Sequence, residues 1–260
     1  MRTQAKALAV AAFLAAAFLF VAAPGAPAEA QPLAAGTEVS LGNANAPLTI
    51  IEYASMTCPH CAEFSNTVFP KLKAEYIDTG KVRLVFREYP LDQNAIYGAM
   101  LARCAGRDRF FPFIEVLFKQ QATWVVAPDP IAALARLGQL GGVSEADFRA
   151  CLADPALRTG ILNTRLEAER QYDVASTPTF IVGTAIVEGA LPWDMFKAAV
   201  EDALAGRPVS NARGGASSSV AGGGSNTFLY VALAVIAVLI AAVGYFFFIR
   251  QPAGRPTGRA

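Results

Sequence analysis

Apolar and polar side chains follow one another along this chain in patterns typical of alternating strands and helices. Residues 48–54 are rich in β-branched and aromatic side chains and predict a strand. Residues 59–79 place apolar side chains four apart on one stripe, which predicts an amphipathic helix kinked at Pro70. Residues 81–87 alternate polar and apolar, as a second strand does. A strand–helix–strand unit of this length predicts two parallel strands joined by a right-handed crossover.

The remaining strands are predicted only after a long helical stretch. Residues 93–172 show helical periodicity and hardly any strand signal. Strands are then expected at 179–182 and 185–188, followed by a closing amphipathic helix at about 192–205. The expected fold class is therefore α/β, with a helical insertion at about 93–172. Within the insertion, helices are expected near 94–106, 110–122, 129–138, 144–153 and 156–171.

Residues 1–30 have the pattern of a secretory signal peptide. Arg2 and Lys6 precede an apolar stretch at 7–23, and small residues suited to signal cleavage follow it. We therefore expect a mature protein that begins near residue 31 and lies outside the cytoplasm. An uncleaved signal anchor is the alternative interpretation.

A second apolar segment lies near the C-terminus, at residues 228–249. It carries no charge and is long enough, as a helix, to cross a hydrocarbon core of about 30 Å. Residues 207–227 are rich in glycine and serine and predict a flexible linker. Arginines in residues 250–260 predict a cytoplasmic tail, which places the main domain, 31–206, on the outer side of a cell membrane.

The composition narrows the class of protein further. The formal net charge is +1, which argues against a nucleic-acid partner. The hydrophobic content of 54% is inflated by the two terminal segments. Residues 31–206 are still numerous enough for one domain with a sizeable core.

The candidate catalytic residues lie where the first predicted strand is followed by a helix, in the segment Cys58-Pro59-His60-Cys61. A thiol at a helix N-terminus lies over unpaired backbone N–H groups and the positive end of the helix dipole. Both favour the thiolate, so we expect Cys58 to have a lowered pKa and to be an exposed nucleophile. Cys61, one turn further along the helix, is placed to attack a mixed disulfide formed by Cys58. The motif predicts thiol–disulfide exchange.

Other interpretations of this motif fit less well. A zinc site needs about four ligands, whereas the chain has four cysteines and one histidine, of which only Cys58, His60 and Cys61 are close in sequence. Attachment of a c-type haem needs a histidine directly after the second cysteine, where this chain has Ala62. A purely structural disulfide between Cys58 and Cys61 is the remaining alternative. We expect no metal and no organic cofactor.

The chain resembles the DsbA-like branch of the thioredoxin superfamily. The resemblance rests on three motifs, their order along the chain and the helical insertion between the second and the third. The motifs are the Cys58–Cys61 motif, residues 86–91 (Phe-Arg-Glu-Tyr-Pro-Leu) and residues 177–180 (Thr-Pro-Thr-Phe). The resemblance covers about residues 37–205 and implies a thioredoxin fold with a helical insertion. It also implies a cis peptide bond between Thr177 and Pro178, beside the active site, where a client peptide binds. From the sequence alone, an ordinary trans turn fits Pro178 equally well.

The resemblance implies further roles in the site. DsbA-like proteins carry a buried acid at the position of Glu52, whose pKa desolvation would raise, so that it could take the proton of Cys61 as a general base. A solvated strand charge is the alternative for Glu52. Pro59 and His60 resemble the dipeptide of DsbA; His60 can donate to the Cys58 thiolate or lie cationic beside it, which would make the disulfide more oxidising. Thr177 is a departure, because DsbA has valine there and isomerase-type relatives commonly have threonine.

Two further cysteines, Cys104 and Cys151, fall within the insertion. In an oxidising compartment such a pair predicts a structural disulfide, and similar non-catalytic pairs occur in some DsbA-like proteins. Closing a loop of this length would stabilise the fold by about 4 kcal/mol in the chain-entropy model. Two buried free thiols and a redox sensor are the alternatives.

Together these features predict a periplasmic or otherwise extracytoplasmic thiol:disulfide oxidoreductase, monomeric and anchored in the membrane by its C-terminal helix. The favoured activity is that of an oxidase that gives its Cys58–Cys61 disulfide to unfolded or reduced secreted proteins. The resemblance implies reoxidation by a membrane partner of the DsbB or VKOR type. A disulfide isomerase or reductase is an alternative, and a redox-inert, membrane-tethered chaperone is an alternative from another class.

Overall fold

The computed structural model describes residues 32–34 and 36–213. The expected signal peptide, the membrane helix at 228–249 and the tail at 250–260 lie outside the described residues. Within the ranges that are described, no helix is both long and apolar enough to cross a membrane.

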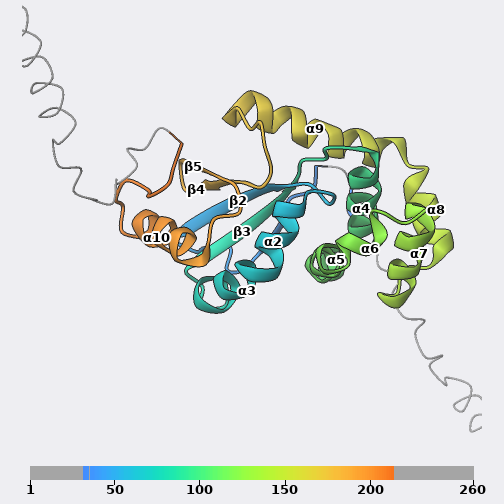
Figure 1. The fold of residues 1–260 in the computed structure, drawn as a ribbon, viewed down its shortest axis with the longest axis horizontal. Coiled ribbons are helices and arrows are strands. Elements are labelled where there is room, and N and C mark those ends of the chain that lie inside the picture. Colours follow the sequence, from blue (N-terminus) through green and yellow to red (C-terminus); the bar gives the residue numbers. More distant parts are fainter. Residues whose placement is uncertain (1–31, 35, 214–260) are drawn as a thin grey trace, which may run out of the picture. The chain divides into compact units, whose positions relative to one another are not determined.

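A five-stranded sheet forms the centre of the fold, in the order β1-β3-β2-β4-β5 (Figure 1). Its two central strands, β2 and β3, are parallel as predicted, and the other neighbouring strands pair antiparallel. The expected strands are confirmed to within one residue, but the three-residue edge strand β1 was not predicted, because so short a segment carries no readable alternation. The strands are β1 (Val39–Leu41), β2 (Leu48–Ala54), β3 (Val82–Glu88), β4 (Thr179–Val182) and β5 (Ala185–Glu188).

The chain after the first cysteine forms three short helices rather than the single kinked helix expected over residues 59–79. They are α2 (Pro59–Thr67), α3 (Phe69–Leu72) and the π-helix η1 (Lys73–Ile77). The break falls at Val68, so that Pro70 lies in the first turn of α3. A proline has no N–H to donate, and the first turn of a helix is where none is needed.

The insertion is helical throughout, as predicted. Four of its helices begin after a side chain that caps them: Asp92, Asp129, Ser144 and Asp154 each accept a hydrogen bond from a backbone N–H of the following turn. The short helix α6 was expected as the end of its neighbour α5. The helices are α4 (Gln93–Cys104), α5 (Arg107–Lys119), α6 (Gln121–Trp124), α7 (Pro130–Leu140), α8 (Glu145–Leu152) and α9 (Pro155–Tyr172).

Helices cover both faces of the sheet, with α9 on one side and α2, α3 and α10 (Trp193–Leu204) on the other (Figure 1). On the α9 side, Ala168 packs in a small cluster with Tyr53 and Ile181. On the other side, the ring of Phe180 lies 4.4 Å from Phe64 and 4.9 Å from Phe196, centroid to centroid. Because strand residues alternate between faces, Tyr53 points to α9 and Glu52 points to the side of the cysteines.

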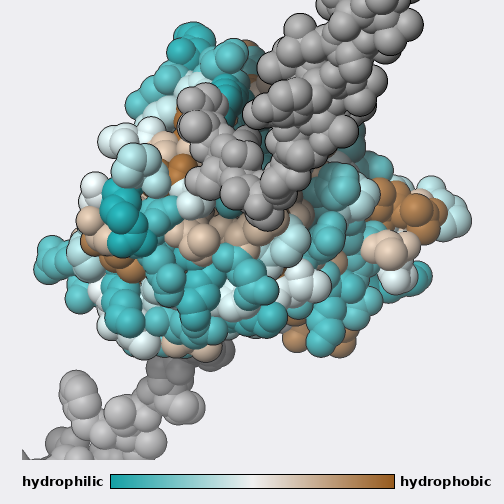
Figure 2. All heavy atoms as spheres, turned by 60° about the vertical axis from the view of Figure 1, so that its left-hand side comes forward, coloured by the Kyte–Doolittle hydropathy of each residue, from teal (hydrophilic) through white to brown (hydrophobic). Residues whose placement is uncertain are grey.

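The last described residues, 207–213, differ from the expected start of a flexible linker. Arg207 and Ser210 hydrogen-bond to Asp202 at the end of α10, and Ala212 forms a bridge with Val187 of β5. The face drawn in Figure 2 is largely hydrophilic, with small separate hydrophobic patches. Most of the large apolar side chains of the described residues are buried in the core.

Candidate active site

The first cysteine of the motif caps a helix, as its position in the sequence predicts. Cys58 is the N-cap residue of α2, with φ −77° and ψ 120°, and Pro59 occupies the first helical position. The turn before it is fixed by a hydrogen bond from the Cys58 N–H to the Ser55 carbonyl, 3.1 Å long. The Cys58 sulfur therefore lies beside the free N–H groups of the first turn of α2.

These surroundings lower the pKa of Cys58 to about 5, from an ordinary value of 9.0. The largest cause is the Cys61 thiol, which donates a hydrogen bond to the Cys58 thiolate. Burial acts in the opposite direction, and the Thr177 side chain and the N–H groups of Cys61 and His60 lower the pKa further. Cys58 is therefore a thiolate at neutral pH, as the sequence predicted.

Cys61 has the opposite character. It is fully buried, and both this burial and the neighbouring Cys58 raise its pKa well above the ordinary value. A thiolate and a buried thiol side by side match the expected division into a nucleophile and a second, resolving cysteine.

The expectation that Cys58 is exposed is wrong, since only 5% of the residue is accessible. Its sulfur faces the loop before β4, 3.3 Å from the Thr177 carbonyl, to which it donates a hydrogen bond when it is protonated. That loop lies 119 residues away along the chain, so its covering of Cys58 cannot be read from the local pattern. An attacking thiol must approach through the small opening that is left.

His60 lies at the surface, with 71% of its side chain exposed. Its ring faces Glu63, with 3.5 Å between Nδ1 and Oε2. It is the backbone N–H of His60 that acts on Cys58. The structure thus gives His60 an influence on the thiolate through its main chain, where the sequence suggested one through its ring.

The peptide bond between Thr177 and Pro178 is cis, as the resemblance implied. The Thr177 hydroxyl is buried, and its oxygen has no hydrogen-bond partner among the described residues. When Cys58 is a thiolate, that hydroxyl can turn its proton toward the sulfur, which is how it lowers the pKa of Cys58. Thr177 therefore contacts the nucleophile through its carbonyl and affects it through its hydroxyl.

Glu52 is buried beneath the cysteines, so the alternative of a solvated strand charge is wrong. Desolvation raises its pKa to about 8, and its charge in turn helps to raise the pKa of Cys61. The carboxyl group lines a cavity of about 10 Å³ between α2, β3 and α5, which also reaches Ser65 and Glu115. This volume is close to what one water molecule needs. A buried carboxyl group with this pKa can exchange protons near neutral pH.

Three polar residues support the turn that carries Cys58, and sequence reasoning missed all three. The Thr57 hydroxyl donates to the Asp92 carboxylate over 2.6 Å. The side-chain amide of Gln121 donates to the carbonyls of Met56 and Cys58. Asp92 and Gln121 both belong to the insertion, and only the tertiary fold brings them to the turn.

The other two cysteines lie in α4 and α8. The structure joins Cys104 and Cys151 by a disulfide, with 6.3 Å between their Cα atoms, whereas Cys58 and Cys61 are free thiols.

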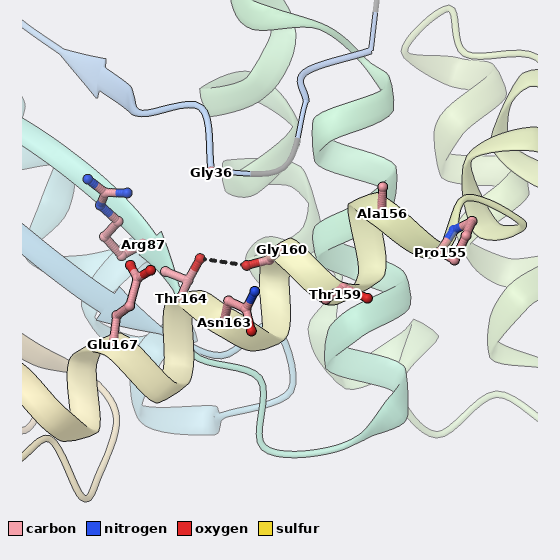
Figure 3. A pocket seen from close by; sticks show the side chains of 9 residues that line it. All are labelled: Gly36, Arg87, Pro155, Ala156, Thr159, Gly160, Asn163, Thr164 and Glu167. Atoms are coloured by element: carbon pink, nitrogen blue, oxygen red, sulfur yellow. Dashed lines mark hydrogen bonds between the residues drawn. The ribbon is translucent and has the colours of Figure 1, made fainter.

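A groove of about 610 Å³ lies away from the cysteines, between α9 and the chain around Gly36 (Figure 3). In that view Arg87 and Glu167 lie at the same end of the groove, and the Arg87 guanidinium group extends away from Glu167. Arg87 pairs instead with Glu38. The groove is lined by Gly36, Arg87, Pro155, Ala156, Thr159, Gly160, Asn163, Thr164 and Glu167. None of the expected site residues lines it.

A thiolate at the start of a helix, a buried second thiol and a cis proline beside them define a redox protein with a DsbA-like thioredoxin fold. A family model described as Thioredoxin matches residues 34–202. The chain belongs to this thioredoxin family.

Individual relatives agree with this assignment. A Rickettsia bellii protein described as a protein-disulfide oxidoreductase is 37% identical over 147 residues, which are 56% of this chain and 56% of that protein. The match thus spans little more than half of the relative. The disulfide bond formation protein D of Bacillus subtilis is 26% identical over 192 residues, covering 68% of this chain and 81% of that protein. Among solved structures, α-DsbA1 of Wolbachia pipientis superposes with a TM-score of 0.60 at 29% identity, covering 67% of this chain and 94% of that one.

Proposed function

We propose that this protein is an extracytoplasmic thiol:disulfide oxidoreductase that acts as an oxidase, giving its Cys58–Cys61 disulfide to folding secreted proteins. The observation that carries the proposal is the contrast between the two cysteines, one with a pKa of about 5 and one with a strongly raised pKa. A stabilised thiolate favours the reduced form of the pair. A protein that is more stable when reduced readily gives its disulfide away.

The reaction begins when a client thiolate attacks the Cys58 sulfur. The Cys58–Cys61 bond breaks, a mixed disulfide forms between the client and Cys58, and Cys61 leaves as a thiolate that takes up a proton. A second client thiolate then attacks the client sulfur of the mixed disulfide. The client gains a disulfide, and Cys58 leaves as the stabilised thiolate. Two electrons pass from the client to the cysteine pair.

Glu52 serves the proton transfers of Cys61. With a pKa of about 8 it is mostly protonated at neutral pH, so it can give a proton to the leaving Cys61 thiolate. In the reverse direction its carboxylate takes the proton from Cys61 when this residue attacks a mixed disulfide. The burial of both groups keeps bulk water from doing this task directly.

The relatives and the termini of the chain suggest where the reaction takes place. The Bacillus relative is named for the formation of disulfide bonds. The apolar segments at 1–30 and 228–249 favour an exported domain tethered to the membrane. Reoxidation then falls to a membrane partner of the DsbB or VKOR type, and we propose that the tethered domain is a monomer.

The reduction potential of Cys58–Cys61 tests the direction of the reaction. The full chain, with Cys104 and Cys151 changed to Ala, is equilibrated against glutathione, and the reduced fraction is measured by thiol labelling. A potential above about −160 mV supports an oxidase, whereas one near −250 mV or below, in the thioredoxin range, contradicts it.

A disulfide isomerase is the second candidate, favoured by threonine at position 177 next to the nucleophile. Recovery of activity from a client with scrambled disulfides distinguishes it, because an oxidase acts well only on a reduced client. Full function in cells of a Cys58→Ser variant would instead indicate the redox-inert chaperone.

A further inference from the structure

Gln121 reaches from the insertion to the backbone of the active-site turn. It is the first residue of α6, and only 8% of it is exposed. Its Nε2 donates to the Met56 carbonyl over 2.9 Å and to the Cys58 carbonyl over 3.0 Å. Both hydrogens of the amide group are thus used on the segment between β2 and α2.

The two carbonyls determine how this segment is oriented. The Cys58 carbonyl also accepts the hydrogen bond of the Ala62 N–H, the first in α2. Holding this carbonyl fixes the plane of the Cys58–Pro59 peptide, and therefore the direction of the helical N–H groups relative to the Cys58 sulfur. Those N–H groups, of His60 and Cys61, are the ones that stabilise the thiolate.

Gln121 is held on a rigid support. The indole of Trp124, in the same helix, donates to the Leu117 carbonyl over 2.8 Å. Gly98 of α4 approaches both Met56 and Trp124 so closely that an added Cβ would lie 3.1 Å and 3.3 Å from their side chains. The turn and α6 are therefore packed against the same helix, which leaves the amide group little freedom to move.

The chemistry of the side chain suits this position. A primary amide is neutral and offers two donors, so it can satisfy two buried carbonyls without bringing a charge into the interior. A glutamate of the same shape would place acceptor oxygens against two carbonyl oxygens. A methionine of similar length would fill the space and leave both carbonyls without this partner.

We propose that Gln121 is a positioning residue of the redox site, which holds the active-site turn so that the first N–H groups of α2 point at the Cys58 sulfur. It touches neither the sulfur nor a client and acts through the Cys58 main chain. By this route the insertion contributes to the oxidising character of the cysteine pair. The inference rests on Cys58–Cys61 being the redox pair, and not on the direction of the reaction.

The test compares Gln121→Met and Gln121→Ala with the unchanged full chain. Two quantities are measured: the pKa of Cys58, from the ultraviolet absorbance of its thiolate, and the equilibrium constant with glutathione. We expect the pKa to rise by about one unit in both variants and the equilibrium constant to move toward the disulfide by up to about tenfold. Gln139→Ala, at an exposed position of α7, is the matched control and leaves both quantities unchanged.

Gln121→Met separates positioning from packing, because it retains most of the buried volume. Thermal unfolding of each variant shows that it is folded when its pKa is measured. A lower melting temperature with an unchanged Cys58 pKa and an unchanged equilibrium constant in both variants would overturn the proposal and leave Gln121 a structural role only. If the unchanged protein does not exchange disulfides with glutathione, the proposed function fails, while the pKa comparison still decides the role of Gln121.

Discussion

Arg103 and Glu88 form a bidentate ion pair in the interior of the protein. The Arg103 Nε lies 2.5 Å from Glu88 Oε1, its Nη2 lies 2.9 Å from Oε2, and 2% of each side chain is exposed. The same guanidinium group donates to the carbonyls of Ala34 and Thr37. Glu88 ends β3 and Arg103 lies near the end of α4, so one buried pair joins the sheet, the insertion and the segment before β1.

Removing one partner of this pair will destabilise the protein strongly. Arg103→Met leaves Glu88 buried without its cation, which costs about 3–5 kcal/mol of the free energy of unfolding. Urea unfolding of the full chain measures the loss. Arg149→Met, which breaks the exposed pair with Glu145, serves as the control and should cost at most about 1 kcal/mol. Equal losses of unfolding free energy in the two variants would show that the buried pair contributes no more to stability than an exposed one.

The stability of the reduced protein will depend on pH through Cys58. Its pKa in the folded protein is about 5, below the ordinary value of 9.0 that applies to the unfolded chain. A lowered pKa means that the thiolate stabilises the fold fully above the unfolded value and that this contribution is lost as the pH falls through about 5. The disulfide form has no such thiolate. The difference in unfolding free energy between reduced and oxidised protein should therefore shrink as the pH is lowered, and a constant difference would contradict the assignment.

Glu52 will show the opposite pH dependence. Its pKa is raised from 4.5 to about 8, so its contribution to stability is present below pH 4.5 and is lost as the pH rises through 8. Glu52→Gln removes this loss and should be more stable than the unchanged protein at alkaline pH. The same change should slow the attack of Cys61 on a mixed disulfide by about 10²-fold, because the buried proton acceptor is gone. Stopped-flow kinetics with a model mixed disulfide measures the step, with Glu63→Gln, at an exposed position of α2, as the control.

The Cys104–Cys151 disulfide should affect stability and not redox chemistry. Changing both residues to Ala removes a cross-link between positions 47 apart and lowers the free energy of unfolding by about 4 kcal/mol. The reduction potential of Cys58–Cys61 should be unchanged. Chemical denaturation and glutathione equilibration on the same sample check both statements, and a shifted potential would show that the two pairs are coupled.

The sequence is informative wherever structure follows from neighbouring residues. The pattern at 48–54 predicts β2, and the helical periodicity near 144–153 predicts α8, because both depend only on residues close together in the sequence. The low pKa of Cys58 could be foreseen for the same reason, since its helical donors follow it directly in the chain.

What could not be foreseen depends on contacts between distant segments. The burial of Cys58 comes from the loop at Thr177, and the support of its turn comes from Gln121, 63 residues further along. Gln121 follows Gln120 in a helical stretch, and nothing in the local sequence distinguishes the buried donor from a solvated side chain. The ion pair between Glu88 and Arg103 is hidden in the same way, because charged residues at these positions are typical of a protein surface.

The segment that returns along β5 has a consequence for how copies of this protein meet. β5 is an edge strand, and an edge with free N–H and C=O groups can recruit the strand of another molecule. Here the Arg213 N–H donates to the Ile186 carbonyl, Ala212 bridges Val187, and the Arg213 guanidinium pairs with Glu188. The chain thereby occupies its own sheet edge just before the stretch that leads to the apolar C-terminal segment. A second copy of the protein would find this part of the β5 edge already paired, which disfavours sheet-to-sheet association there.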